Sequence, residues 1–140
     1  MTPNNFRYIK RELEDLISQN LNKGKAIILY GPRRAGKTTF IKHFFQSRHI
    51  SHLYLNCREK RIQEQVVADS LKLKAIIDDY ENIVFDEAQY LDAPGEVFSL
   101  LIDSNPKLNI IASGSSSNSI YLSTANHPSN FTTEPEALNT

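Results

Sequence analysis

The chain has 140 residues and a mass of 15.9 kDa, a length that favours a single domain. Hydrophobic residues make up 40% and charged residues 23%, so the composition is that of a globular protein and excludes a wholly disordered chain. The 16 basic and 16 acidic residues cancel to a net charge of zero, which argues against a protein that coats nucleic acid through bulk charge.

Further features of the sequence narrow the class of protein. The single cysteine, Cys57, excludes an internal disulfide and a zinc site built from cysteines. The longest apolar run, residues 26–30, is too short to span a membrane. Glu12, Glu14 and Asp15 lie where a signal peptide would need an apolar segment, so we expect a cytoplasmic protein with no membrane partner.

The body of the sequence alternates between helical and strand patterns. Apolar residues at spacings of three and four predict helices, and short, almost wholly apolar runs predict buried strands. In chain order these patterns predict a helix over 6–21, a strand over 25–30, a helix over 38–48, a strand over 52–57, a helix over 59–80, a strand over 82–85, a helix over 95–103 and a strand over 108–113. Strands separated by helices indicate an α/β fold in three layers, with helices on both faces of a mainly parallel sheet.

Residues 114–140 differ in composition from the rest of the chain. They contain Glu134 and Glu136 but no lysine or arginine, and they are rich in Ser, Thr, Asn and Pro. Their few apolar residues show little sustained period. We therefore expect a folded core over residues 1–113 and an irregular tail over residues 114–140.

The strongest motif lies between the first predicted strand and the helix that follows it. It fits the pattern G-x-x-x-x-G-K-[ST] and, with one further residue, gives the candidate nucleotide-binding set Gly31, Pro32, Arg33, Arg34, Ala35, Gly36, Lys37, Thr38 and Thr39. The glycines let backbone N–H groups turn toward one concavity that binds phosphate oxygens, and the helix N-terminus adds its dipole. Lys37 would bring a charge to the β- and γ-phosphates, and Thr38 would offer a hydroxyl to Mg²⁺, which prefers oxygen ligands.

A second motif is an apolar strand that ends in two acids. Asp86 and Glu87 follow the apolar residues 83–85, and Asp86 lies 49 residues after Lys37. Parallel strands deliver their carboxyl ends to one edge of the sheet, so both acids should lie near the phosphate loop. Asp86 would hold Mg²⁺ directly or through a water, and Glu87 would polarise the attacking water, which favours hydrolysis. The alternative interpretation is a strand end with exposed acids and no chemistry.

The last predicted strand ends in a Ser-rich segment. A polar residue at this position could sense the γ-phosphate or orient the water, and Ser113 is the first candidate, with Ser115 as the second. The alternative is an exit turn without chemistry.

Together, residues 31–38, 83–89 and 110–116 resemble the prokaryotic AAA-type ATPases that have a GPRRxGKT loop. The resemblance covers residues 6–117 and implies a P-loop NTPase core that binds ATP. It implies catalytic and metal-binding roles for a set that the motifs above already single out: Lys37 and Thr38 at the phosphates and metal, Asp86 and Glu87 as the metal and water acids, and Ser113 near the γ-phosphate.

The chain departs from this family's pattern after residue 117. The family continues with a Leu-rich helix, a Gly-Arg pair and a fifth strand, whereas no arginine or lysine follows Lys107 here. We expect the fifth strand to be missing, which would leave residues 26–30 at an exposed sheet edge and favour self-association. The restriction-endonuclease-like C-terminal domain usual in the family is absent, so we expect a truncated AAA-type core whose partner is such a domain.

The predicted function is Mg²⁺-dependent ATP hydrolysis. It should be slow in isolation, because the region after Lys107 has no arginine to stabilise transition-state charge. The first alternative is a nucleotide-binding module or decayed fragment without catalysis, which a turnover assay would distinguish. A less favoured alternative is a helicase-type motor fragment, because residues 86–89 resemble the second helicase motif. Stimulation by single-stranded DNA would support it, although the neutral net charge does not favour a nucleic-acid partner.

Overall fold

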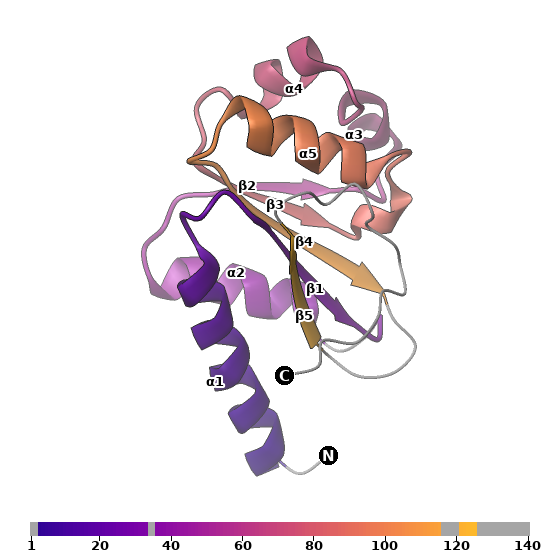
Figure 1. Ribbon diagram of the computed structural model, residues 1–140. Helices are drawn as coiled ribbons and strands as arrows, with labels where there is room; N and C mark the ends of the chain where they lie inside the picture. Colours follow the sequence, from indigo (N-terminus) through magenta and orange to yellow (C-terminus); the bar gives the residue numbers. More distant parts are fainter. Residues whose placement is uncertain (1–2, 34–35, 116–120, 126–140) are drawn as a thin grey trace.

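The computed structural model describes residues 3–33, 36–115 and 121–125 and confirms the predicted α/β architecture. In chain order the elements are α1 (Pro3–Asn20), β1 (Ala26–Gly31), α2 (Lys37–Ser47), β2 (Leu53–Asn56), α3 (Lys60–Gln65), α4 (Ser70–Ile77), β3 (Asn82–Asp86), the short 3₁₀ helix η1 (Ala88–Tyr90), α5 (Pro94–Ser104), β4 (Asn109–Ser115) and β5 (Tyr121–Ala125). Figure 1 shows three layers, with α1 and α2 on one face of the sheet and α3, α4 and α5 on the other.

The strand order in the sheet determines which chain segments meet. The five strands lie in the order β2-β3-β4-β1-β5, and the pairs β2–β3, β3–β4 and β4–β1 are parallel. The carboxyl ends of β1, β3 and β4 therefore lie side by side at one edge of the sheet. This edge brings together the loop after Gly31, the acids at Asp86 and Glu87, and the serines at the end of β4.

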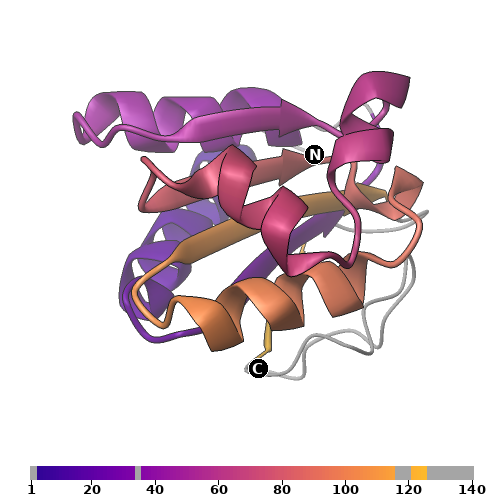
Figure 2. The ribbon, with the colours of Figure 1, turned by 90° about the horizontal axis from the view of Figure 1, so that it is seen from above.

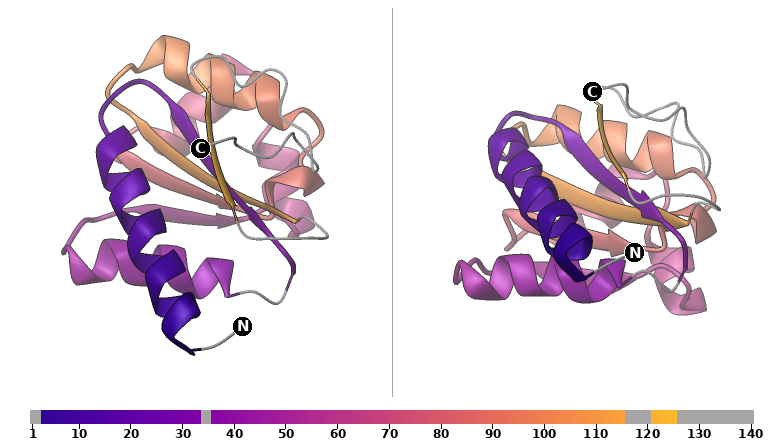
Figure 3. Two further views of the ribbon diagram at one scale, coloured as in Figure 1. Left: turned by 60° about the horizontal axis from the view of Figure 1, so that its bottom comes forward. Right: turned by 90° about the horizontal axis from the view of Figure 1, so that it is seen from below.

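Each face of the sheet has its own hydrophobic core, because successive strand residues point to opposite faces. The core beneath α1 and α2 consists of Leu13, Ile17, Ile27, Leu29, Phe40, Ile41, Phe44, Phe45, Val84, Ile111 and Leu122. Figure 3 shows these two helices in front of the sheet in the view from below. The view from above, Figure 2, shows α3, α4 and α5 over the opposite face, where Phe85 packs on Phe98 with ring centroids 5.1 Å apart.

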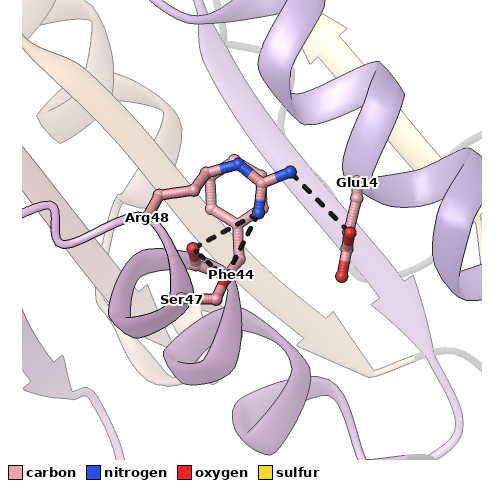
Figure 4. Close-up of polar contacts among 4 residues, drawn as sticks. All are labelled: Glu14, Phe44, Ser47 and Arg48. Atoms are coloured by element: carbon pink, nitrogen blue, oxygen red, sulfur yellow. Dashed lines mark hydrogen bonds and ion pairs between the residues drawn. The ribbon is translucent and has the colours of Figure 1, made fainter.

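The two helices on the lower face touch through the end of α2. The guanidinium of Arg48 lies 4.1 Å from the centroid of the Phe44 ring and forms an ion pair with Glu14 of α1 at 3.7 Å (Figure 4). Such an exposed pair contributes at most about 1 kcal/mol, so the apolar residues Leu13 and Ile17 are what hold α1 on the sheet. No helix within the described ranges has the length and apolarity needed to cross a membrane.

The expectation that the fifth strand is missing is wrong. β5 pairs antiparallel with β1, with Leu29 opposite Leu122, so β1 lies between β4 and β5 and is not at a sheet edge. The predicted irregular tail likewise contains strand residues, since β4 extends to Ser115 and β5 covers residues 121–125. β5 escaped prediction because a strand can pair with β1 through backbone hydrogen bonds without an alternating apolar pattern of its own. The burial of Leu122, which is 3% exposed, fixes which face of β5 points toward the core. The boundary at residue 113 between core and tail stays a prediction.

The single helix predicted over residues 59–80 is also wrong, because the structure divides it into α3 and α4. Asp69 lies in an extended conformation between them, and its carboxylate accepts hydrogen bonds from the backbone N–H groups of Leu71 and Lys72. This cap satisfies N–H groups that a continuous helix would have paired internally. The helical spacing of the apolar residues continues across the break, because both α3 and α4 pack their apolar residues on the upper face of the sheet.

Replacing Asp69 by alanine is expected to lower the free energy of unfolding by about 1 kcal/mol, because it removes an N-cap acceptor. Chemical denaturation of the purified chain measures this change. Asp78→Ala is the matched control: Asp78 caps the other end of α4, where a negative charge opposes the helix dipole, so its loss should not destabilise. Equal destabilisation by both variants would contradict the capping role.

Candidate functional site

The loop between β1 and α2 leaves the buried sheet and turns directly into a helix N-terminus. β1 ends at Gly31 and α2 begins at Lys37, with Gly36 between them in the left-handed conformation, φ 83°. Only glycine adopts this φ without strain, which explains the glycine at this position. Because Gly36 has no side chain, it cannot cap the first turn of α2, and those N–H groups face the loop.

The predicted nucleotide-binding residues are placed as follows. Gly31 and Lys37 are buried, Pro32 and Thr38 are partly buried, and Arg33, Gly36 and Thr39 are exposed. Arg34 and Ala35 lie outside the described residues. The loop's nucleotide-binding role stays a prediction.

The ammonium group of Lys37 is buried beneath the loop. It donates to the carbonyl oxygens of Gly31 at 2.7 Å and Pro32 at 2.9 Å, and its residue is 5% exposed. Burial lowers the pKa of Lys37, and the carboxylates of Glu87 and Asp86 oppose that shift. A buried cation that two acids stabilise beside the N-terminus of a helix is suited to bind a polyphosphate.

Asp86 is the centre of a group of hydroxyls. Its Oδ2 accepts from Thr38 Oγ1 at 2.8 Å and also from the Tyr54 hydroxyl, while its Oδ1 accepts from Ser113 Oγ at 2.6 Å. The carboxylate is 5% exposed, so these donors replace the water that a charged group would otherwise need. Burial and the contact with Asp86 raise the pKa of Tyr54 well above its ordinary value, which keeps its hydroxyl protonated as a donor.

Glu87 lies beside Asp86 with a strained backbone. Its φ is 57°, a left-handed value that is unusual for a residue other than glycine and often found at functional sites. The N–H of Glu87 donates to Ser113 Oγ at 2.8 Å, which holds the strained turn. Its carboxylate oxygen Oε2 accepts from Gln89 Nε2 at 2.5 Å and from Ser115 Oγ at 3.1 Å, and 8% of the residue is exposed.

Ser113 links the two acids. The same hydroxyl accepts from the Glu87 N–H and donates to Asp86, and the residue has no exposed surface. These contacts favour a role in orienting both acids. Direct contact between Ser113 and a γ-phosphate stays a prediction, and Ser115, which is partly exposed, contacts Glu87 as well.

The donors around Thr38 and Asp86 fit Mg²⁺. Both offer oxygen, the ligand type that Mg²⁺ prefers, and one of them is a carboxylate. Their oxygens lie 2.8 Å apart at the mouth of the loop, as two groups that share one ion or its bound waters would. Within the part of the chain that the structure describes, Asp86 forms no ion pair that would withdraw its carboxylate from a cation.

Arg33 is held away from the backbone of its own loop. Its guanidinium donates to the Tyr90 hydroxyl at 2.5 Å, and Arg58 lies 5.9 Å from the centroid of the same ring. Arg33 is nevertheless near enough to Lys37 to contribute to lowering the pKa of that lysine. The loop thus presents a second positive charge beside the first.

The sequence patterns did not single out Tyr54, and they gave no role to Gln89 although it lies within the motif of residues 83–89; Tyr54 contacts Asp86 and Gln89 contacts Glu87. Tyr54 belongs to β2, and it lies near Asp86 because β2 pairs with β3 in the sheet. Gln89 follows the acid pair by two residues, so proximity in sequence was the available signal.

Comparison with known proteins adds independent findings. The protein family described as an AAA domain matches residues 23–134. An uncharacterized ATP-binding protein from Methanocaldococcus jannaschii is 47% identical over 49 residues, which cover 34% of this chain and 83% of that protein.

Proposed function

This chain belongs to the AAA domain family, and from that premise we propose that it binds ATP and hydrolyses it with Mg²⁺. Within the family we assign it to the prokaryotic AAA-type ATPases with a GPRRxGKT loop, on residues 31–38. The relative from Methanocaldococcus jannaschii, named as an ATP-binding protein, supports the choice of nucleotide.

One observation carries the proposal: Thr38 of the loop and Asp86 of β3 share a hydrogen bond of 2.8 Å although 48 positions separate them in sequence. The buried Lys37 ammonium comes from the residue before Thr38, so the candidate phosphate-binding cation and the candidate metal ligands lie together. Phosphoryl transfer depends mainly on positioning and charge neutralisation, and these residues supply both.

The proposed roles follow from the contacts. N–H groups at the start of α2 and the Lys37 ammonium would bind the β- and γ-phosphates. Thr38 and Asp86 would hold Mg²⁺, which, when bound, neutralises phosphate charge. Glu87 would accept a proton from the attacking water, with its carboxylate oriented by Ser115 and Gln89.

Turnover by this chain alone is proposed to be slow. An arginine finger contributes about 10³–10⁵ in rate where one is present, and no arginine or lysine follows Lys107. The rate should therefore be well below that of an ATPase with a complete set of cations, while binding is unaffected.

Calorimetric titration of the purified chain with ATP in the presence of Mg²⁺ tests the proposal. We expect micromolar binding, and a phosphate-release assay on the same sample should detect slow turnover. GTP is the comparison nucleotide. A folded chain that binds no ATP would overturn the proposal, and binding without any turnover would favour the nucleotide-binding module.

A further inference from the structure

Tyr54 reaches the candidate metal site from a strand that contributes nothing else to it. β2 and β3 are parallel, with Tyr54 in register with Val84 and Asn56 in register with Asp86. Val84 and Asp86 are two residues apart and so point to the same face of the sheet, the face that α2 covers. From the neighbouring strand, the Tyr54 side chain extends diagonally on that face and its hydroxyl donates to Asp86 Oδ2.

The hydrogen bonds to Asp86 leave few positions on its carboxylate open. A carboxylate has about four acceptor positions, two on each oxygen. Thr38 and Tyr54 occupy the two on Oδ2, and Ser113 occupies one on Oδ1. Among the described residues, these donors leave one of these positions, on Oδ1, without a hydrogen bond. Tyr54 thus helps to fix the orientation of the carboxylate.

The Tyr54 ring is itself held in place. Lys42 Nζ lies 4.2 Å from the ring centroid, and Lys42 is one helical turn after Thr38 on α2. The ring also packs against the core beneath α1 and α2. Its hydroxyl therefore has a fixed position from which to orient the carboxylate.

We propose that Tyr54 is a positioning residue for the candidate metal site: by donating to Oδ2 it would fix the orientation of the Asp86 carboxylate that, together with Thr38, would hold Mg²⁺. The inference rests on the proposed function, because it concerns how strongly Mg²⁺ assists ATP binding.

Tyr54→Phe removes the hydroxyl and keeps the ring that packs beneath Lys42, so the variant should fold. ATP is titrated calorimetrically into each protein, once with excess Mg²⁺ and once with EDTA. The ratio of the two dissociation constants measures the contribution of the metal. For Tyr54→Phe we expect this ratio to fall by about tenfold, the usual effect of losing a residue that orients a metal ligand, with affinity in EDTA unchanged.

Tyr80→Phe is the matched control. It makes the same chemical change just before β3 begins, at the opposite end of the strand from Asp86, and it should leave the ratio at the wild-type value. Thermal unfolding without nucleotide confirms that both variants are folded.

Each other outcome has a distinct meaning. A wild-type ratio in Tyr54→Phe overturns the inference, and so does an equal loss of affinity in Mg²⁺ and EDTA, which would indicate an effect on the loop. Equal ATP affinity of the wild type in the two conditions overturns the inference while ATP binding stands. No ATP binding by the wild type overturns the proposed function, and the inference with it.

Discussion

Replacing Lys37 by alanine is expected to weaken ATP binding by at least about 100-fold, which corresponds to about 2.8 kcal/mol. The ammonium is buried at 5% exposure and already bonded to two loop carbonyls, so it is held where phosphate oxygens would arrive. Charge-assisted hydrogen bonds contribute about 1.5–3 kcal/mol each, so the loss of two to the phosphates would reach this value. Calorimetric titration with Mg²⁺ and ATP measures it.

The fold should survive this change, because Lys37 lies at the start of α2 and outside both apolar cores. Alanine is also a better helix former than lysine. Lys72→Ala is the matched control: it removes an equal charge from an exposed position on α4, on the opposite face of the sheet, and should leave ATP affinity unchanged. Unchanged affinity in Lys37→Ala would show that the phosphate site lies elsewhere.

Replacing Glu87 by glutamine is expected to keep ATP binding and to lower turnover by at least about 100-fold, the range in which general-base catalysis contributes. Glutamine has nearly the same shape, and its carbonyl oxygen can still accept from Gln89 and Ser115. What the variant cannot do is take a proton from water. Phosphate release measured at saturating ATP tests the prediction.

Glu81→Gln serves as the control, since Glu81 is exposed just before β3 and the substitution there is chemically identical. It should hydrolyse ATP at the wild-type rate. If Glu87→Gln hydrolyses ATP as fast as the wild type, another group activates the water. If it instead loses ATP binding, Glu87 supports the loop through its field on Lys37 rather than through catalysis.

The parts of this fold that can be predicted from the sequence are the buried strands, because each contains a short run of apolar residues. β1, β3 and β4 are short, buried segments, and each ends close to where its apolar run ends. Parallel strands deliver their carboxyl ends to one edge, so the strand positions alone predict that Lys37 and Asp86 lie at the same edge of the sheet. This is why the sequence led to the right pair of segments without a structure.

β5 and the break between α3 and α4 depend on interactions that an apolar period does not record. β5 is fixed by backbone pairing to β1, and its residue Leu122 enters a core cluster. The helix break depends on the carboxylate of Asp69, while the apolar residues on either side keep their spacing. One capping residue and one short strand change the composition of the sequence too little to be predicted from it.

Tyr54 escaped prediction for a different reason. Its importance depends on β2 lying next to β3 with Asn56 in register with Asp86, and strand order cannot be deduced from the order of strands along the chain. From sequence alone, an aromatic residue in a strand is predicted to belong to the hydrophobic core, and the Tyr54 ring does pack against the core beneath α1 and α2. Its hydroxyl acquires a chemical meaning only once the neighbouring strand is known.

β1, which leads into the candidate phosphate loop, and β2, which carries Tyr54, should differ in their resistance to local opening, because β1 has partner strands on both sides. β1 is hydrogen-bonded to β4 on one side and β5 on the other, whereas β2, within the described ranges, pairs with β3 alone. Releasing β1 would require breaking two ladders of backbone hydrogen bonds, so we expect this strand to open less readily than β2. The strand that carries Tyr54 can detach by breaking one. Local opening would therefore reach Tyr54, on β2, before it reaches Gly31, where the candidate phosphate loop begins.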